Sequence, residues 1–99
     1  MTNKIYLLVE DSCCYGEDDV KHRAFTDKAS ALKAYERARL NTIRNSEWKE
    51  YFDAKGVVLE EYRDCIACLE TDGEYFSVYE DGYYYSNHYT VYCKEVELE

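Results

Sequence analysis

A chain of 99 residues, 46% hydrophobic and 16% aromatic, is long enough for one hydrophobic core, which argues against both a disordered chain and a multidomain protein. Its longest apolar run, residues 5–9, is far shorter than the roughly 20 residues that cross a bilayer, and it lacks the features of a signal peptide. The five cysteines, an odd number set among apolar neighbours, are typical of reduced thiols. These features predict a cytoplasmic protein.

The net charge of −9 is confined to the C-terminal part of the chain. Residues 1–55 carry ten basic and ten acidic side chains, whereas residues 56–99 carry two basic and eleven acidic ones. The same C-terminal part holds eight of the twelve tyrosines. An acidic, tyrosine-rich segment of this kind is expected to present a surface that meets a positively charged partner.

The first part of the chain predicts two strands and a long helix. Residues 4–10 are typical of a buried strand, residues 11–19 are expected to be a loop, and residues 20–25 are expected to be a short edge strand. Thr26 or Asp27 can cap a helix, because a short side-chain oxygen accepts hydrogen bonds from the free N–H groups of its first turn. The helix is predicted from a stripe of side chains at three- and four-residue steps, namely Ala31, Leu32, Tyr35, Ala38, Thr42 and Ile43.

A second helix is predicted directly after the first. Ser46 can cap its N-terminus, and Gly56 is placed to end it. The apolar residues expected on one face of this helix are Trp48, Tyr51 and Phe52. Residues 57–64 fit either a helix or a strand, and a strand is expected by Cys65.

The remainder of the chain predicts antiparallel strands. Turn signals at residues 71–73 and 80–82 enclose a segment in which half-polar and apolar positions alternate. Residues 88–98 form the expected final strand, and a shift of its alternation at residues 94–96 indicates a β-bulge. This order of elements predicts an α+β fold, a single domain over residues 1–99 with two helices packed on one face of an antiparallel sheet.

Two cysteines offer a candidate metal site. Cys65 and Cys68 have the spacing of half a zinc site, and further ligands are available in Cys13, Cys14, Cys93, His22 and His88. Structural zinc sites normally have two such pairs, however, and residues three apart on a strand face opposite sides of the sheet. We therefore expect core thiols, with no metal ligands and no cofactor, and keep a zinc-dependent module as a lesser alternative.

No motif predicts catalysis. Twenty-one acidic residues form many carboxylate pairs, but such a pair serves catalysis only where burial separates the two pKa values. The chain has no phosphate-binding loop, no nucleotide fingerprint and no serine–histidine–acid order. Residues 21–55 carry nine basic and five acidic side chains, yet a net charge of −9 opposes contact with phosphates. A non-catalytic protein that binds neither nucleic acid nor membranes directly is expected.

Acidic residues and tyrosines around the two turn signals form the candidate binding surface. Its members are Glu70, Asp72, Glu74, Glu80, Asp81, Tyr83, Tyr84 and Tyr85. Three successive tyrosines cannot all face one core, so at least one is expected to be exposed, where tyrosine supplies the contact area that interfaces favour. The surrounding carboxylates would steer a basic partner. In the alternative interpretation, the acidic residues maintain solubility and the tyrosines fill a thin core.

The C-terminal string FSVYEDGYYYSNHYTVYCKEVELE, and a short strand followed by FTDKASALKAYE, are similar to small acidic proteins of bacteriophages and mobile elements. The likeness covers about a third of the chain and includes no catalytic motif. Some proteins of this group, among them anti-CRISPR and anti-restriction proteins, block host nucleases by presenting a DNA-like surface. The resemblance implies an inhibitor of a nuclease or DNA-binding complex in the host cytoplasm, and it assigns no site residues. The alternative is a self-associating structural or regulatory module, a homodimer that pairs through sheet edges by its final strand.

Overall fold

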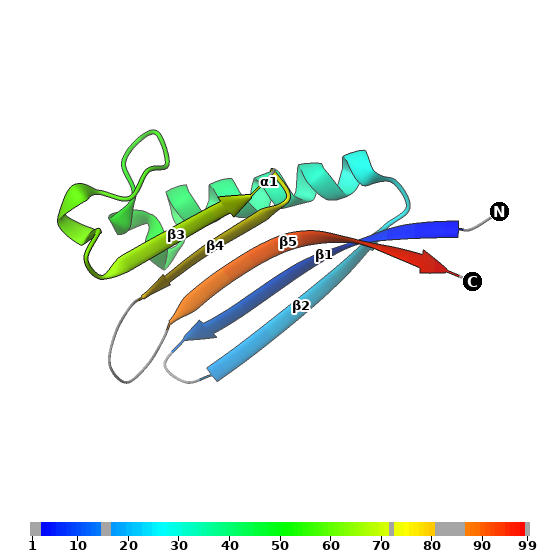
Figure 1. Cartoon of the computed structure of the whole chain (residues 1–99), viewed down its shortest axis with the longest axis horizontal. Coiled ribbons are helices and arrows are strands. Elements are labelled where there is room, and N and C mark those ends of the chain that lie inside the picture. The colour runs from blue at the N-terminus through cyan, green and yellow to red at the C-terminus, as the bar shows by residue number, and fades with distance from the viewer. Residues whose placement is uncertain (1–2, 15–16, 72, 81–86, 99) are drawn as a thin grey trace.

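The computed structural model describes residues 3–14, 17–71, 73–80 and 87–98, which form an antiparallel sheet with a long helix across one face (Figure 1). Within these residues the sheet has five strands, which are β1 (Asn3–Cys14), β2 (Glu17–Phe25), β3 (Ile66–Thr71), β4 (Tyr75–Glu80) and β5 (His88–Leu98). Their order across the sheet is β2-β1-β5-β4-β3, so β5 lies in the centre and β2 and β3 form the edges. The helical segments are α1 (Lys28–Asn45) and two 3₁₀ helices, η1 (Glu47–Tyr51) and η2 (Glu60–Tyr62). The predicted α+β fold is confirmed.

Helix α1 forms because its N-terminus is capped and one of its faces is apolar. Asp27 Oδ2 accepts a hydrogen bond from the backbone N–H of Ser30 at 2.8 Å, which satisfies one free N–H group of the first turn. The buried side of α1 packs on the sheet side chains that alternate toward it. Together with side chains from the segment after α1 they form the core, which consists of Leu8, Tyr35, Ile43, Trp48, Phe52, Ile66, Phe76, Val78 and Val91. Each large apolar side chain buried in this way contributes roughly 1.5–3 kcal/mol to folding.

The prediction of a second α-helix is wrong in detail, because the segment after α1 forms only the short 3₁₀ helix η1. Ser46 does cap this segment, since its side-chain oxygen accepts a hydrogen bond from the N–H of Trp48 at 3.1 Å. Phe52 then adopts an extended conformation and forms an isolated β-bridge with Val58, so the chain turns back before another helical turn can form. Gly56, with φ of +80°, serves this turn instead of ending a helix. No helix in the described ranges has the length and apolar character needed to cross a membrane.

The predicted loop at residues 11–19 is also wrong for its described part, because both strands of the first hairpin extend through it. Asp11 pairs with Val20 and Cys13 pairs with Asp18 in an unbroken antiparallel ladder. On its other side, β1 pairs with β5 as far as the Cys13–His88 pair. The backbone hydrogen bonds of these two ladders hold polar residues in a strand that their sequence alone does not favour.

The predicted β-bulge at residues 94–96 is absent, since β1 and β5 pair in one continuous register from Asn3–Leu98 to Cys13–His88. The alternation of polar and apolar residues along β5 is interrupted for another reason. Lys94 lies on the sheet face opposite α1, and Glu95 lies near the exposed end of the other face, where its carboxylate is 3.4 Å from Lys4 Nζ. β5 pairs with β1 along its length and with β4 over residues 88–92, so over those five residues it has no free edge for the edge-to-edge pairing expected of a homodimer.

Candidate functional site

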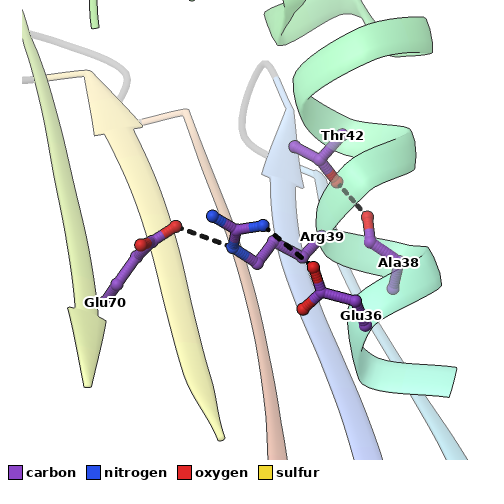
Figure 2. A network of polar contacts seen from close by, with 5 residues as sticks. All are labelled: Glu36, Ala38, Arg39, Thr42 and Glu70. Carbon is purple, nitrogen blue, oxygen red and sulfur yellow. Dashed lines mark hydrogen bonds and ion pairs between the residues drawn. The ribbon is translucent and has the colours of Figure 1, made fainter. Parts of the chain in front are cut away.

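Two of the predicted binding residues, Glu70 and Glu74, are held by cations of α1. Arg39 Nε donates a hydrogen bond to Glu70 Oε1 at 2.7 Å, and the other arm of the same guanidinium contacts Glu36 at 3.2 Å (Figure 2). Lys28 Nζ lies 2.9 Å from Glu74 Oε1. The hydrogen bonds to Glu70 and Glu74 raise the pKa values of Arg39 and Lys28, respectively. These two glutamates therefore fasten the β3–β4 hairpin to the helix.

Glu80 lies at the other end of the same hairpin. Residues 71 and 75 pair where β3 meets β4, whereas Glu80 pairs with Ile66 at the far end of the ladder. Five steps of about 3.3 Å along β4 separate the two positions, a distance of roughly 17 Å. Glu70 and Glu80 thus lie toward opposite ends of the β3–β4 ladder. Five further predicted residues lie outside the described residues, namely Asp72, Asp81, Tyr83, Tyr84 and Tyr85.

At its own end of the sheet, Glu80 meets two glutamates that sequence reasoning did not select. Glu47 and Glu50 of η1 line a depression of about 210 Å³ together with Glu80, and its aromatic wall consists of Trp48 and Tyr51. Burial, followed by the charge of Glu50 and its hydrogen bond, raises the pKa of the Tyr51 hydroxyl, and the charge of Glu80 adds to the shift. Below, Glu47, Glu50 and Glu80 are called the acidic cluster.

Two carboxylates of this cluster, Glu50 and Glu80, differ from Glu70 and Glu74 in their partners. Among the described residues, no lysine or arginine forms an ion pair with Glu50 or Glu80. The aromatic wall is well anchored, because Trp48 belongs to the core and the Tyr51 ring packs edge-on against Tyr62 with centroids 4.9 Å apart. Rigid aromatic rings beside solvated carboxylates are a combination suited to contact with cationic side chains.

The fold brings other acidic residues to the same end of the molecule. In Figure 1 the C-terminal end of β1, the start of β2, the end of β4 and the segment that contains η1 and η2 all lie toward the left of the view. The acidic residues of these segments, besides the cluster itself, include Glu17, Asp18, Asp19, Glu60 and Glu61. One of them, Asp19, has a cationic partner in Lys21 at 3.7 Å. Counting charge along the chain missed this arrangement, since Glu17–Asp19 and the η1 glutamates belong to the neutral N-terminal part.

Basic side chains line a different surface. A groove of about 440 Å³ runs between α1 and β2, with Arg23 and Arg37 on its rim. The guanidinium of Arg23 stacks 5.2 Å from the centroid of the Phe25 ring. Glu10 also lines the groove, and its Oε1 accepts a hydrogen bond from the hydroxyl of Tyr89 at 2.7 Å. Because a carboxylate lines this groove together with the two arginines, the groove is poorly suited to binding phosphates.

The cysteine pair occupies two different environments. Cys65 is exposed before β3, whereas Cys68 is half-buried against the core. Burial raises the pKa of the Cys68 thiol to about 11, which disfavours the thiolate that binds metals. Within the described part of the chain, no group of three or more histidine, cysteine or acidic residues is arranged to hold a metal ion.

Comparison of the chain with protein-family models, with curated proteins and with solved structures finds no match in any of the three.

Proposed function

We propose that this chain is a small non-catalytic binding protein whose acidic end competes with nucleic acid for the basic groove of a nucleic-acid-handling protein. The observation that carries the proposal is the convergence of Glu47, Glu50 and Glu80, from segments 30 residues apart, around the aromatic wall of Trp48 and Tyr51. Carboxylates that stand in for phosphates need to gather in space, and here the turn after α1 and the end of β4 supply them together.

The partners of the carboxylates favour this end over the β3–β4 turn. Glu70 and Glu74 already bind Arg39 and Lys28, so an incoming arginine would have to displace an existing ion pair. Glu50 and Glu80 have no such ion pair among the described residues, and their charge is available to a guanidinium, which forms strong hydrogen bonds with carboxylates.

Electrostatics sets the expected character of the complex. Acidic groups at one end of a chain of net charge −9 steer a basic partner and accelerate its association. Salt screens exposed charges beyond about 10 Å at 0.1 M, so binding should weaken steeply as ionic strength rises. The Tyr51 ring, which is partly exposed, then supplies apolar contact area that salt does not screen.

The proposal is tested with the triple variant Glu47→Gln, Glu50→Gln and Glu80→Gln. A control variant removes three carboxylates elsewhere, by Glu36→Gln, Glu95→Gln and Glu97→Gln, and so has the same net charge. Each immobilised protein is exposed to a bacterial lysate at low salt, and the proteins released by high salt are identified. The DNA affinity of each retained DNA-binding protein is then measured with and without the chain.

We expect the native chain and the control to retain a DNA-binding protein and to displace its DNA, and the triple variant to lose at least about tenfold in affinity, or roughly 1.4 kcal/mol. Equal retention by the triple variant would contradict the proposed site. A retained protein whose DNA affinity is unaffected by the chain would contradict competition.

A further inference from the structure

The sheet face opposite α1 carries large apolar side chains among polar ones and lacks a covering layer in the described structure. Side chains alternate along a strand, so the register places Leu7, Val9 and Val20 on this face, together with Leu69, Tyr75 and Tyr92. The helix and both 3₁₀ helices pack with the core on the other face (Figure 1). These six residues are called the open face below.

Large apolar side chains of the open face meet solvent. Leu69 is 53% exposed, Val20 49% and Tyr75 37%. Exposed apolar groups gathered on one face mark an interaction surface, whereas scattered ones are ordinary. Val20 and Leu69 lie on the edge strands β2 and β3, and Tyr75 lies on β4, so exposed apolar side chains occur at both edges of this face.

Cross-strand contacts make the open face an ordered layer. The rings of Tyr75 and Tyr92 stack with centroids 6.1 Å apart and planes 29° apart. On the neighbouring row, the hydroxyl oxygens of Ser77 and Thr90 are 2.8 Å apart, so one of these hydroxyls donates a hydrogen bond to the other. Such a surface is suited to packing against another sheet, because the inner faces of stacked sheets interdigitate about 10 Å apart.

We propose that the open face packs against the open face of a second copy of this chain, which gives a two-fold symmetric sandwich of two sheets with α1 on each outer side. The size of the surface fits this occupant. Strands of these lengths, with about 3.3 Å per residue and about 4.8 Å between strands, present a face of roughly 700 Å². A stable interface buries about 800 Å² on each partner.

The charges on this face are self-complementary under such symmetry. Lys94 is paired with Leu7, and Asp11 lies four residues further along β1, about 13 Å away. A two-fold axis that crosses the strands near the Val9–Tyr92 pair brings Lys94 of each copy over the Asp11 row of the other. Among the described residues, Lys94 has no ion pair and Asp11 has only His88, at 3.4 Å.

This inference is independent of the proposed function, because the acidic cluster projects from the end of the sheet and not from the open face. In the sandwich the two acidic clusters point away from each other at opposite ends. Loss of dimerisation therefore leaves each cluster intact, and loss of partner binding leaves the dimer intact.

The experiment is sedimentation equilibrium of the purified chain over a wide concentration range, at moderate salt and under reducing conditions. The native chain is expected to show a monomer–dimer equilibrium. Val20→Glu and Tyr75→Glu each place a carboxylate on the open face and should raise the dimer dissociation constant by at least about tenfold. Val57→Glu is the matched control, because Val57 is 50% exposed but lies on the other side of the molecule beside Ile66, and it should leave the constant unchanged.

Exchanging the charges of Lys94 and Asp11 tests the relative orientation of the two copies, and it uses variants whose fold can be verified. Lys94→Asp and Asp11→Lys should each weaken the dimer, and the double variant should recover most of the loss, with circular dichroism confirming the fold of every variant. A native chain that stays monomeric at all concentrations overturns the proposal. A dimer that is indifferent to Val20→Glu and Tyr75→Glu, or a double variant weaker than both single variants, overturns it as well.

Discussion

Arg39 of α1 binds Glu70 of β3 with an N–O distance of 2.7 Å (Figure 2), and its guanidinium lies 5.9 Å from the centroid of the Phe76 ring. The arginine thus covers one side of the core and ties the helix to an edge strand of the sheet. Replacing Glu70 by Gln should lower the free energy of unfolding by about 0.5–1 kcal/mol at low salt, a modest loss because the carboxylate is largely solvated. Urea denaturation at low and high salt measures the change.

Glu36→Gln is the matched control for this ion pair, because Glu36 contacts the same guanidinium at the longer distance of 3.2 Å and within one helix. It should cost less than Glu70→Gln. Equal losses for the two variants, or a loss for Glu70→Gln that high salt does not reduce, would contradict the role assigned to the link between α1 and β3.

The N-cap of α1 predicts a loss of stability in acid. Hydrogen bonds from the backbone and side chain of Ser30 lower the pKa of Asp27 below its ordinary value of 3.8. A carboxyl whose pKa is lower in the folded state stabilises the fold above the unfolded value, and this contribution disappears as the pH falls through the folded value. Thermal unfolding followed by circular dichroism should therefore show less loss in Asp27→Asn than in the native chain between about pH 5 and pH 3.

Asparagine retains the cap, since it also accepts a hydrogen bond at this position, but it cannot titrate. Asp27→Ala should be less stable than Asp27→Asn at neutral pH. The same acid dependence in Asp27→Asn and in the native chain would show that other carboxyls, such as Asp53, whose pKa is lowered by the N–H groups of Val57 and Lys55, control the transition.

The core predicts where truncation is most costly. Phe76 is fully buried between α1 and the sheet, and Phe76→Ala should lower the free energy of unfolding by about 3–5 kcal/mol, since the change removes apolar contacts and leaves a cavity. Val57→Ala, on the exposed turn, should stay within about 0.5 kcal/mol of the native value. Urea denaturation compares the two, and similar losses would contradict the position of the core.

The thiols predict selective alkylation. Burial raises the pKa of Cys68 to about 11, whereas Cys65 is exposed, so iodoacetamide should modify Cys65 first in the folded chain and both cysteines equally in urea. Mass spectrometry of digested protein assigns the modified residue. Equal rates in the folded chain would contradict the burial of Cys68, and joint protection of both thiols by added zinc would revive the zinc-dependent alternative.

How far the sequence predicted this molecule depends on the range of the interactions involved. α1 was predicted in place because its signals are local, with Asp27 as the cap and Tyr35 and Ile43 two turns apart on one face. The lengths of β1 and β2 were not predicted, since polar residues such as Asp11 become strand residues only through pairing with distant segments. Short-range patterns carry no signal of such pairing.

The candidate site shows the same difference between local patterns and long-range contacts. Composition indicated an acidic surface, but it could not show that Glu70 would bind an arginine of α1, or that η1 would bring Glu47 and Glu50 beside Glu80. Both outcomes follow from the length of α1, which carries the chain from one end of the sheet to the other before η1 begins (Figure 1). The acidic cluster becomes apparent only when the acidic residues of each helix, turn and strand are placed on the folded chain.

The central position of β5 has a consequence for the order of assembly during synthesis. The β1–β2 and β3–β4 hairpins emerge from the ribosome first, and in the finished sheet β5 alone joins them. Until β5 is released, β1 and β4 lack the partner that they share in the finished sheet, and the nascent chain consists of two hairpins without a common sheet. Pairing strands that are far apart in the sequence is slow, so the sheet should form only after β5 has been translated. Before that point, a chaperone that covers exposed strand edges could bind the nascent chain.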